Sequence, residues 1–340
     1  MANFFFIKNW PERKKNLIKR NIFRRTILIS LFIILFSAST FIGILDIKLI
    51  DLLKLDREAW HNFLYFRIPR SVSIVLASAG LAVAGIIMQA ISQNKFISPT
   101  TSGTISATQL GMLVALLLFP MGSSFVKFGF AFISALIFSI FLMVILNKIK
   151  IKNIIYLPLI GMMYGSIISS ITSVLAGMFG KLQTVQSWNV GSFTLLVKGR
   201  YELLYIIFIP VLLAYIYATK FSIVGMGEDF SKNLGINYKS VILLGLVLVS
   251  IISSLTYIIV GPLPFLGLII PNIITLIYGD NLKKSMIDII FLSAIYILIC
   301  DILARTIRYP YEIPISFVAG VFGSLIFIII LFGRVKYGSK

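Results

Sequence analysis

The chain has 340 residues, of which 59% are hydrophobic and 13% charged, and its formal net charge at pH 7 is +19. Soluble domains carry about a quarter charged residues, so this composition excludes an ordinary soluble fold. The basic residues lie between apolar segments and do not line one face together with aromatic residues. This distribution argues against a nucleic-acid partner. The single cysteine, Cys300, provides neither an internal disulfide nor a cysteine-rich metal site.

A basic segment, residues 1–25, precedes the first apolar stretch. No small-residue cleavage pattern follows that stretch convincingly, so we expect an uncleaved cytoplasmic segment ahead of a retained first span. Its Lys and Arg residues are expected to lie against anionic membrane lipid.

Ten apolar stretches follow, each near the ~20 residues that cross about 30 Å of hydrocarbon. The first five predicted spans are residues 26–45, 71–92, 104–119, 125–146 and 154–179. The second five are residues 203–219, 241–260, 265–278, 287–305 and 315–332. The eighth is short and is expected to be broken by Pro271. We therefore predict an all-α polytopic membrane protein, with a ten-helix domain over residues 26–335 and a cytoplasmic tail over residues 336–340.

The loops predict the orientation of these spans. Lys and Arg are more frequent in the segments that ten spans would place inside, so both termini are expected to be cytoplasmic. Of the outer segments, residues 46–70 mix acidic and basic residues as an amphipathic surface element would. A second outer segment, residues 180–202, is long enough for a short interfacial helix.

Small residues recur at every fourth position of the fifth span and lie along one stripe of the helix: Gly161, Gly165, Ser169, Ser173 and Gly177. The tenth span repeats the pattern with Ser316, Gly320 and Ser324. Such a stripe permits close packing of helices, and it also suits the lining of a wide, weakly polar pathway. Both interpretations stay open. The second assigns the pathway to Gly165, Ser169, Ser173, Ser316 and Gly320.

The predicted spans contain few ionisable residues. Their acidic residues are Asp288 and Asp301, both near the ends of the ninth span. Ion-coupled carriers usually need ionisable groups at mid-membrane, so an ion-coupled secondary transporter is the weaker alternative. Asp301 and Arg305 are spaced i,i+4 with the acid first, the favourable order for an intrahelical ion pair.

Catalytic motifs are missing from the predicted spans. The one histidine, His61, lies in an outer segment, so neither an HExxH zinc site nor a Ser-His-Asp triad can be assembled within the membrane. We expect no enzymatic activity, no metal site and no cofactor. If transport is uphill, another subunit must hydrolyse the nucleotide.

Six ordered motifs resemble those of the FecCD permeases, a family that imports iron-siderophores, haem and vitamin B12. They are Arg67-Ile68-Pro69-Arg70 (RxPR); Gly85, Gln89 and Asn94 (GxxxQxxxxN); Trp188 with Gly191-Ser192 (WxxGS); Gly227-Glu228 through Leu234-Gly235 (GE…LG); Gly261-Pro262 with Phe265, Gly267-Leu268 and Pro271 (GPxxFxGLxxP); and Asp301 to Arg305 with Glu312-Ile313-Pro314 (ADxxAR…ELP). The resemblance covers nearly the whole chain after its N-terminal extension. It implies a type II ABC importer permease fold, with ten helices in an inverted-repeat arrangement.

Two positions depart from the usual family pattern. Lys95-Phe96 replaces Pro-Leu, and Asn272 replaces a histidine. Residues 94–101 resemble a branch that imports catecholate-type ferric siderophores, often through two different permease chains. The resemblance thus implies a ferric siderophore as cargo, with haem and vitamin B12 as alternatives.

The resemblance also implies partners in a bacterial cytoplasmic membrane. These are a second permease subunit, identical or paralogous, two ATP-binding subunits and an extracytoplasmic siderophore-binding lipoprotein. Arg67, Arg70 and Arg305 match the arginines of RxPR and ADxxAR, and would receive acidic residues of the binding protein. Guanidinium groups suit this use because they pair bidentately with carboxylates, although contact with lipid headgroups is an alternative.

On the predicted inner side, residues 227–238 have the pattern of a short amphipathic helix with Gly235 as its C-cap. The resemblance assigns coupling to the ATPase to this segment, through Gly227, Glu228, Leu234 and Gly235. An ordinary solvated loop is the alternative interpretation.

Overall fold

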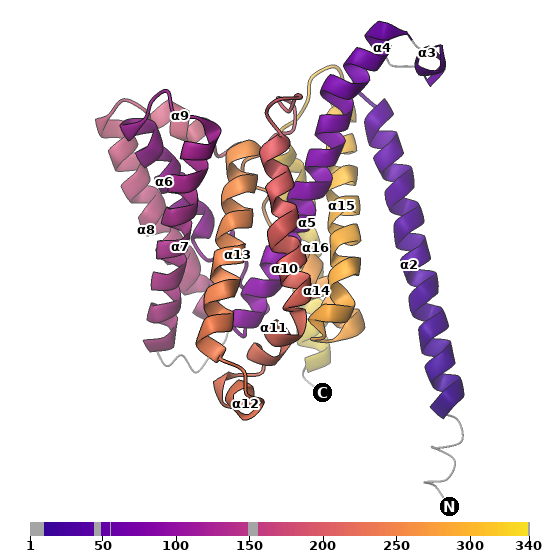
Figure 1. The fold of residues 1–340 in the computed structure, drawn as a ribbon, viewed down its shortest axis with the longest axis vertical. Coiled ribbons are helices and arrows are strands. Elements are labelled where there is room, and N and C mark those ends of the chain that lie inside the picture. Colours follow the sequence, from indigo (N-terminus) through magenta and orange to yellow (C-terminus); the bar gives the residue numbers. More distant parts are fainter. Residues whose placement is uncertain (1–9, 44–48, 55, 149–155, 339–340) are drawn as a thin grey trace, which may run out of the picture.

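The computed structural model describes residues 10–43, 49–54, 56–148 and 156–338, and every regular element within these ranges is helical. The long elements run side by side along one axis (Figure 1). They are α2 (Trp10–Phe41), α5 (Ile68–Ile91), α6 (Thr104–Leu118), α7 (Ser124–Lys148), α8 (Tyr156–Met178), α10 (Phe208–Ile216), α13 (Tyr238–Ile259), α14 (Leu266–Tyr278), α15 (Leu282–Thr306) and α16 (Ile315–Gly338). The short elements are α3 (Leu49–Leu53), α4 (Arg57–Asn62), the π-helix η1 (Phe63–Arg67), α9 (Leu182–Ser187), the 3-10 helix η2 (Glu202–Ile207), α11 (Ala218–Val224) and α12 (Glu228–Asn233).

Among the described residues, 7 helices are long and apolar enough to cross a membrane, or 8 if the bent pair of η2–α10 and α11 counts as one span. Two shorter apolar helices, α6 and α14, accompany them. These segments correspond in order to the ten predicted spans. Parts of five predicted segments lie outside the described ranges: the first nine residues of the basic segment, the end of the first span, residues 46–48 and 55 of the first outer segment, the start of the fifth span and the last two residues of the tail. The predicted domain limits at residues 25 and 335 fall inside α2 and α16.

The expectation that Pro271 breaks the eighth span is wrong, because α14 runs through Pro271. Proline cannot donate a hydrogen bond to the carbonyl four residues earlier, which belongs to Gly267. That carbonyl lies against the backbone of Gly85 on α5, where an added Cβ would come within 1.9 Å of its oxygen. The close approach of a neighbouring helix therefore accommodates the interruption.

The sixth predicted span is the one that is bent. Its two parts, η2–α10 and α11, meet at Tyr217 with an angle of 62°. The bend directs α11 towards α12, which lies at one end of the bundle (Figure 1). The end of the bundle that carries α12 is called the α12 end below. The helix α2 begins and α16 ends at this same end.

The two shorter apolar helices, α6 and α14, both begin after a residue with left-handed backbone. The residue that precedes α6 is Gly103, with φ +75°, and the residue that precedes α14 is Phe265, with φ +63°. Left-handed backbone at a helix start is uncommon, particularly for a bulky residue such as phenylalanine. The helix α6 corresponds to the third of the first five predicted spans, and α14 to the third of the second five. A shared feature at equivalent positions agrees with the predicted inverted repeat.

The core is built around α5. In the most apolar 18-residue stretch of the continuous helix 57–91, which includes α5, 83% of the residues are buried, whereas in that of α2 only 6% are. Alanine, glycine and serine make up much of the buried surface of α5, so α13, α14 and α15 pack closely around it. In contrast, α2 lies at the edge of the bundle and packs mainly on α15 (Figure 1).

Candidate functional site

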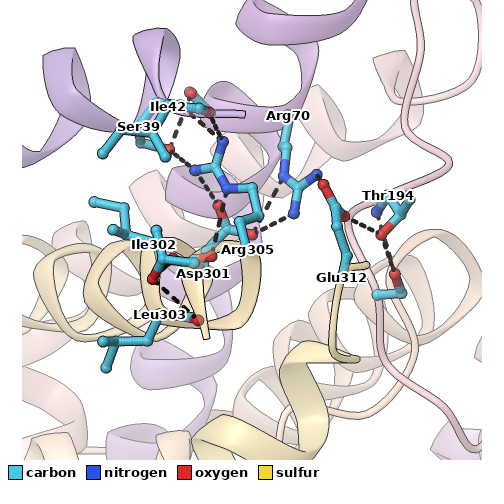
Figure 2. A network of polar contacts seen from close by, with 12 residues as sticks. Ser39, Ile42, Arg70, Thr194, Asp301, Ile302, Leu303, Arg305 and Glu312 are labelled. Carbon is cyan, nitrogen blue, oxygen red and sulfur yellow. Dashed lines mark hydrogen bonds and ion pairs between the residues drawn. The ribbon is translucent and has the colours of Figure 1, made fainter. Parts of the chain in front are cut away.

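Three arginines and two carboxylates meet at the end of the bundle opposite α12. Arg67 and Arg70 lie where η1 continues into α5, and Asp301 and Arg305 lie in the last turns of α15. Glu312 lies in the loop between α15 and α16. These five residues, named the arginine cluster, come from two motifs about 230 residues apart in the sequence, and Figure 2 shows four of them.

Arg70 is held by both carboxylates. Its Nε and Nη2 donate to Oδ1 of Asp301 at 3.2 and 2.8 Å, and its Nη1 donates to both carboxylate oxygens of Glu312 at 2.8 and 2.9 Å (Figure 2). The other oxygen of Asp301, Oδ2, forms an ion pair with Nη2 of Arg305 at 2.6 Å, which confirms the predicted i,i+4 pair. A single carboxylate on α15 thus binds two guanidinium groups.

Two arginines of the cluster, Arg67 and Arg305, cap the end of α2. Arg305 donates to the carbonyl of Ser39 at 3.0 Å, to the Ser39 hydroxyl at 2.9 Å and to the carbonyl of Ile42, while Arg67 donates to the carbonyl of Ile42 at 2.8 Å. The last carbonyls of a helix have no intrahelical partner and carry partial negative charge, so cations stabilise them. Gly43 permits this approach, because a Cβ there would overlap the Arg67 guanidinium.

Glu312 connects the cluster to a second loop. Its Oε2 accepts a hydrogen bond of 2.6 Å from Thr194, which follows α9 in the chain. Burial alone would raise the pKa of Glu312, but the positive charge of Arg70 and hydrogen bonds from Thr194 and Arg70 hold it below its usual range. Glu312, Arg67, Arg70 and Thr194 line an open cavity of about 280 Å³ together with Phe66, Phe193 and Leu196.

The structure thus brings together all three arginines that the sequence predicted as one site. They are engaged within the chain, since Arg70, Arg67 and Arg305 are all largely buried and hydrogen-bonded to it. From the sequence, Glu312 stood out only as part of a motif, and Thr194 had no predicted role. An acid that follows two arginine motifs is the signal that could have identified Glu312 as their partner.

Other motif residues join the loops to the helices. The N–H of Ser192 donates to the carbonyl of Val260 at 2.9 Å, and a Cβ on Gly191 would meet the carbonyl of Pro262 at 2.3 Å. The WxxGS and GPxxFxGLxxP segments are therefore in direct contact.

The two positions that depart from the family pattern are also in contact. The Asn272 side chain donates to the carbonyl of Lys95 at 2.8 Å and to that of Leu268 at 2.6 Å. The Lys95 ammonium forms an ion pair with Asp280, in the turn before α15. The residues that replace Pro and His thus join the segment after α5 to the middle of α14 and to the turn that follows α14.

At the α12 end, Gly227 precedes α12 and Leu234 and Gly235 follow it. Gly235 has φ +71°, its N–H donates to the carbonyl of Lys232 at 2.9 Å, and the N–H of Ile236 donates to the carbonyl of Ser231 at 3.0 Å. These two bonds form a Schellman C-cap, so the predicted short helix with Gly235 at its end is present, although it stops at Asn233.

Glu228 lies in the first turn of α12 and pairs with Lys232 at 2.9 Å. The hydrogen bond and charge of Glu228 raise the pKa of Lys232. Both side chains are about half exposed or more, so they are accessible to another protein.

The small residues of α8 divide between two faces. Gly165 packs on Gly103, and Ser169 donates to the hydroxyl of Ser106 at 2.9 Å, so both face α6 and the segment before it. Ser173 is exposed. On α16, Ser316 donates its N–H to the carbonyl of Gly191 at 3.3 Å, and a Cβ added to Gly320 would lie 3.5 Å from Cγ of Pro264.

The bundle is that of a polytopic membrane protein, and a comparison with protein families places it in a class of transport proteins. The FecCD transport family matches residues 27–333, so the chain belongs to that family. The petrobactin import system permease protein YclN of Bacillus subtilis (strain 168) is 48% identical over 307 residues, which cover 90% of this chain and 97% of YclN. The petrobactin import system permease protein FatD of Bacillus anthracis is 37% identical, with 91% of each chain covered.

A solved structure has the same fold. It is described as an inward-facing conformation of a putative metal-chelate type ABC transporter. The superposition covers 90% of this chain and 97% of the other with a TM-score of 0.73, at 22% sequence identity.

We predict that the buried carboxylate of Asp301 is needed for folding. Asp301→Ala leaves Arg70 and Arg305 without their shared partner, which should cost about 3–5 kcal/mol. Asp280→Ala is the comparison, because it breaks the ion pair with Lys95 at a side chain that is 73% exposed. This change should cost less than about 1 kcal/mol. Size-exclusion chromatography and thermal unfolding of the solubilised proteins would measure both. Equal losses of folded protein in the two variants would contradict the assignment.

Proposed function

We propose that this chain is the permease subunit of an ABC importer for a ferric siderophore of the petrobactin type. The observation that carries this proposal is the match to the FecCD transport family over residues 27–333, with two relatives named as petrobactin import permeases. Haem and vitamin B12 are the alternative cargoes that the family resemblance leaves open. The names of these two relatives favour a siderophore over both.

The energy for transport would come from two separate ATP-binding subunits, and a second permease subunit, identical or paralogous, would complete the membrane part. In this arrangement the α12 end faces the cytoplasm with both termini, and the arginine cluster faces outward. The exposed side of α8 that carries Ser173, with the small-residue stripe of α16, would line the pathway between the two permease subunits. Gly165 and Ser169 would support that lining through their packing on α6.

The proposal predicts siderophore uptake. A strain that lacks the gene should lose uptake of radiolabelled ferric petrobactin under iron limitation and regain it with the wild-type gene, while haem uptake stays unchanged. Uptake that persists when the ATPase subunit is inactivated, or transport down an ion gradient by the protein alone in liposomes, would refute the proposal and favour a secondary transporter.

We assign binding-protein docking to the cavity beside Arg67 and Arg70. An acidic side chain of the extracytoplasmic binding lipoprotein could enter this cavity, where the guanidinium groups supply charge-assisted hydrogen bonds. Arg305 would act indirectly, since its side chain is 1% exposed and contacts Asp301 and α2. The cluster contains three guanidinium groups and two carboxylates, so a third carboxylate would balance its charge.

A substitution at the cavity tests this assignment without removing an arginine. Thr194→Trp should fill the cavity and weaken binding of the soluble domain of the lipoprotein at least about tenfold, a change of about 1.4 kcal/mol. Leu195→Trp is the matched control, because Leu195 is 74% exposed next door but does not line this cavity. Binding to the permease complex in nanodiscs would be measured by biolayer interferometry. An unchanged affinity for Thr194→Trp, with both variants assembled, would exclude this cavity as the docking site.

We assign ATPase coupling to α12, with Gly227, Glu228, Leu234 and Gly235 as its terminal residues. The helix is short, begins directly after Gly227 and ends in a Schellman C-cap, so it would present a compact polar surface that fits a groove of the ATPase. Its attachment to α11 and α13 would transmit movement of the ATPase to the bundle.

The charge of Glu228 tests this coupling. Glu228→Lys should leave ATP hydrolysis in place and reduce uptake at least about fivefold, because it places a like charge beside Lys232 and reverses the charge offered to the ATPase. The double variant Glu228→Lys, Lys232→Glu restores the intrahelical pair. If uptake returns in the double variant, Glu228 acts on helix stability alone and the coupling role is excluded.

A further inference from the structure

Arg70 has no spare hydrogen-bonding edge for a docking carboxylate. Its Nε and Nη2 donate to Asp301, and its Nη1 donates to Glu312. A guanidinium group presents its donors on fixed edges, so a third carboxylate cannot bind Arg70 bidentately while both partners stay in place. One of the two carboxylates has to leave.

The two carboxylates differ in their freedom to leave. Asp301 lies within α15, its side chain is 1% exposed, and it also binds Arg305. Glu312 lies in the loop between α15 and α16, its side chain is 12% exposed, and it lines the open cavity. Only Glu312 can turn towards solvent without unfolding a helix.

We propose that Glu312 occupies the docking position on Arg70 in the free permease, and that an acidic side chain of the binding protein replaces it there. This inference rests on the proposed docking role of the cavity. Exchange of one carboxylate for another leaves the buried guanidinium paired throughout, and so avoids the large penalty of an uncompensated buried charge.

Protonation does not provide an alternative release. Because Arg70 and Thr194 hold the pKa of Glu312 below its usual range, the side chain remains a carboxylate in mildly acidic surroundings. Arg70 therefore becomes available through a competing anion rather than through a fall in pH.

The exchange would also carry a signal into the bundle. In the free state Glu312 joins the loop before α16 to Thr194 in the loop after α9. The N–H of Ile313 remains bound to the carbonyl of Ala304 at 3.0 Å, so the base of the loop stays fixed on α15. Release of Glu312 breaks its contact with Thr194. Because Glu312 lies just before α16, loss of this contact would let docking act on the start of α16.

Substitutions of Glu312 give opposite results under exchange and under a purely structural role. Exchange predicts that Glu312→Gln tightens binding of the lipoprotein's soluble domain about tenfold, because the competing charge is gone. Glu312→Asp keeps the charge but is one methylene shorter, so it should tighten binding by a smaller factor, about threefold. Glu58→Gln removes a carboxylate from the exposed side of α4 and should change affinity less than twofold. Biolayer interferometry on nanodisc complexes that elute as assembled would give all three affinities.

Weaker or unchanged binding by both Glu312 variants would overturn the exchange and leave Glu312 as a structural partner of Arg70. Tighter binding by Glu312→Gln with no change for Glu312→Asp would also overturn it, because the effect would then be one of net charge. If Thr194→Trp leaves the affinity unchanged, the cavity is not the docking site at all. Failure of the docking proposal is therefore distinguishable from failure of the exchange.

Discussion

The arrangement of three buried guanidinium groups around two carboxylates constrains the whole end of the bundle opposite α12. Removing an arginine from water is costly unless its donors are satisfied, and Asp301 satisfies two arginines at once. This carboxylate fixes the end of α15 against the start of α5, in addition to the close packing of the two helices. The loop that carries Glu312 is then placed by its own pairing with Arg70.

The arginine cluster also explains why α2 keeps its place despite little packing. Arg67 and Arg305 bind its last carbonyls, and at the α12 end Arg25 donates to Asp288 at 3.0 Å and to the carbonyl of Lys284 at 2.9 Å. Between these two ends α2 is largely exposed, as a helix in contact with lipid would be. Polar contacts at the ends thus supplement the limited apolar packing of α2 on the bundle.

Much of the fold could be predicted from the sequence, because the length of an apolar stretch is set by membrane thickness and the motifs keep a fixed order. The pair Asp301–Arg305 and the cap at Gly235 followed from helix geometry alone. The continuity of α14 at Pro271 could not, since it depends on Gly85, a residue of another helix. The bend at Tyr217 has no proline or glycine at its position, and so it left no local signal.

The candidate site was predicted in part. The motifs named the three arginines, but a linear sequence does not show that their donors are already occupied. Glu312 and Thr194 approach Arg70 only because two distant loops fold over the same end of the bundle. The stripe on α8 was likewise ambiguous, because a spacing of four residues cannot tell which small side chains face α6 and which face outward.

The distant origin of the contacts that hold α2 has a consequence for biogenesis. The arginine and aspartate that fasten this first helix, Arg305 and Asp288, are synthesised more than 250 residues after it. Until α15 is made, α2 can contact only η1, which includes Arg67, and the start of α5 at its C-terminal end, and its N-terminal end lacks the Asp288 partner of Arg25. The contacts that hold α2 against α15 thus form only after the ribosome has completed α15, so the earliest helix to enter the membrane gains its main neighbour late.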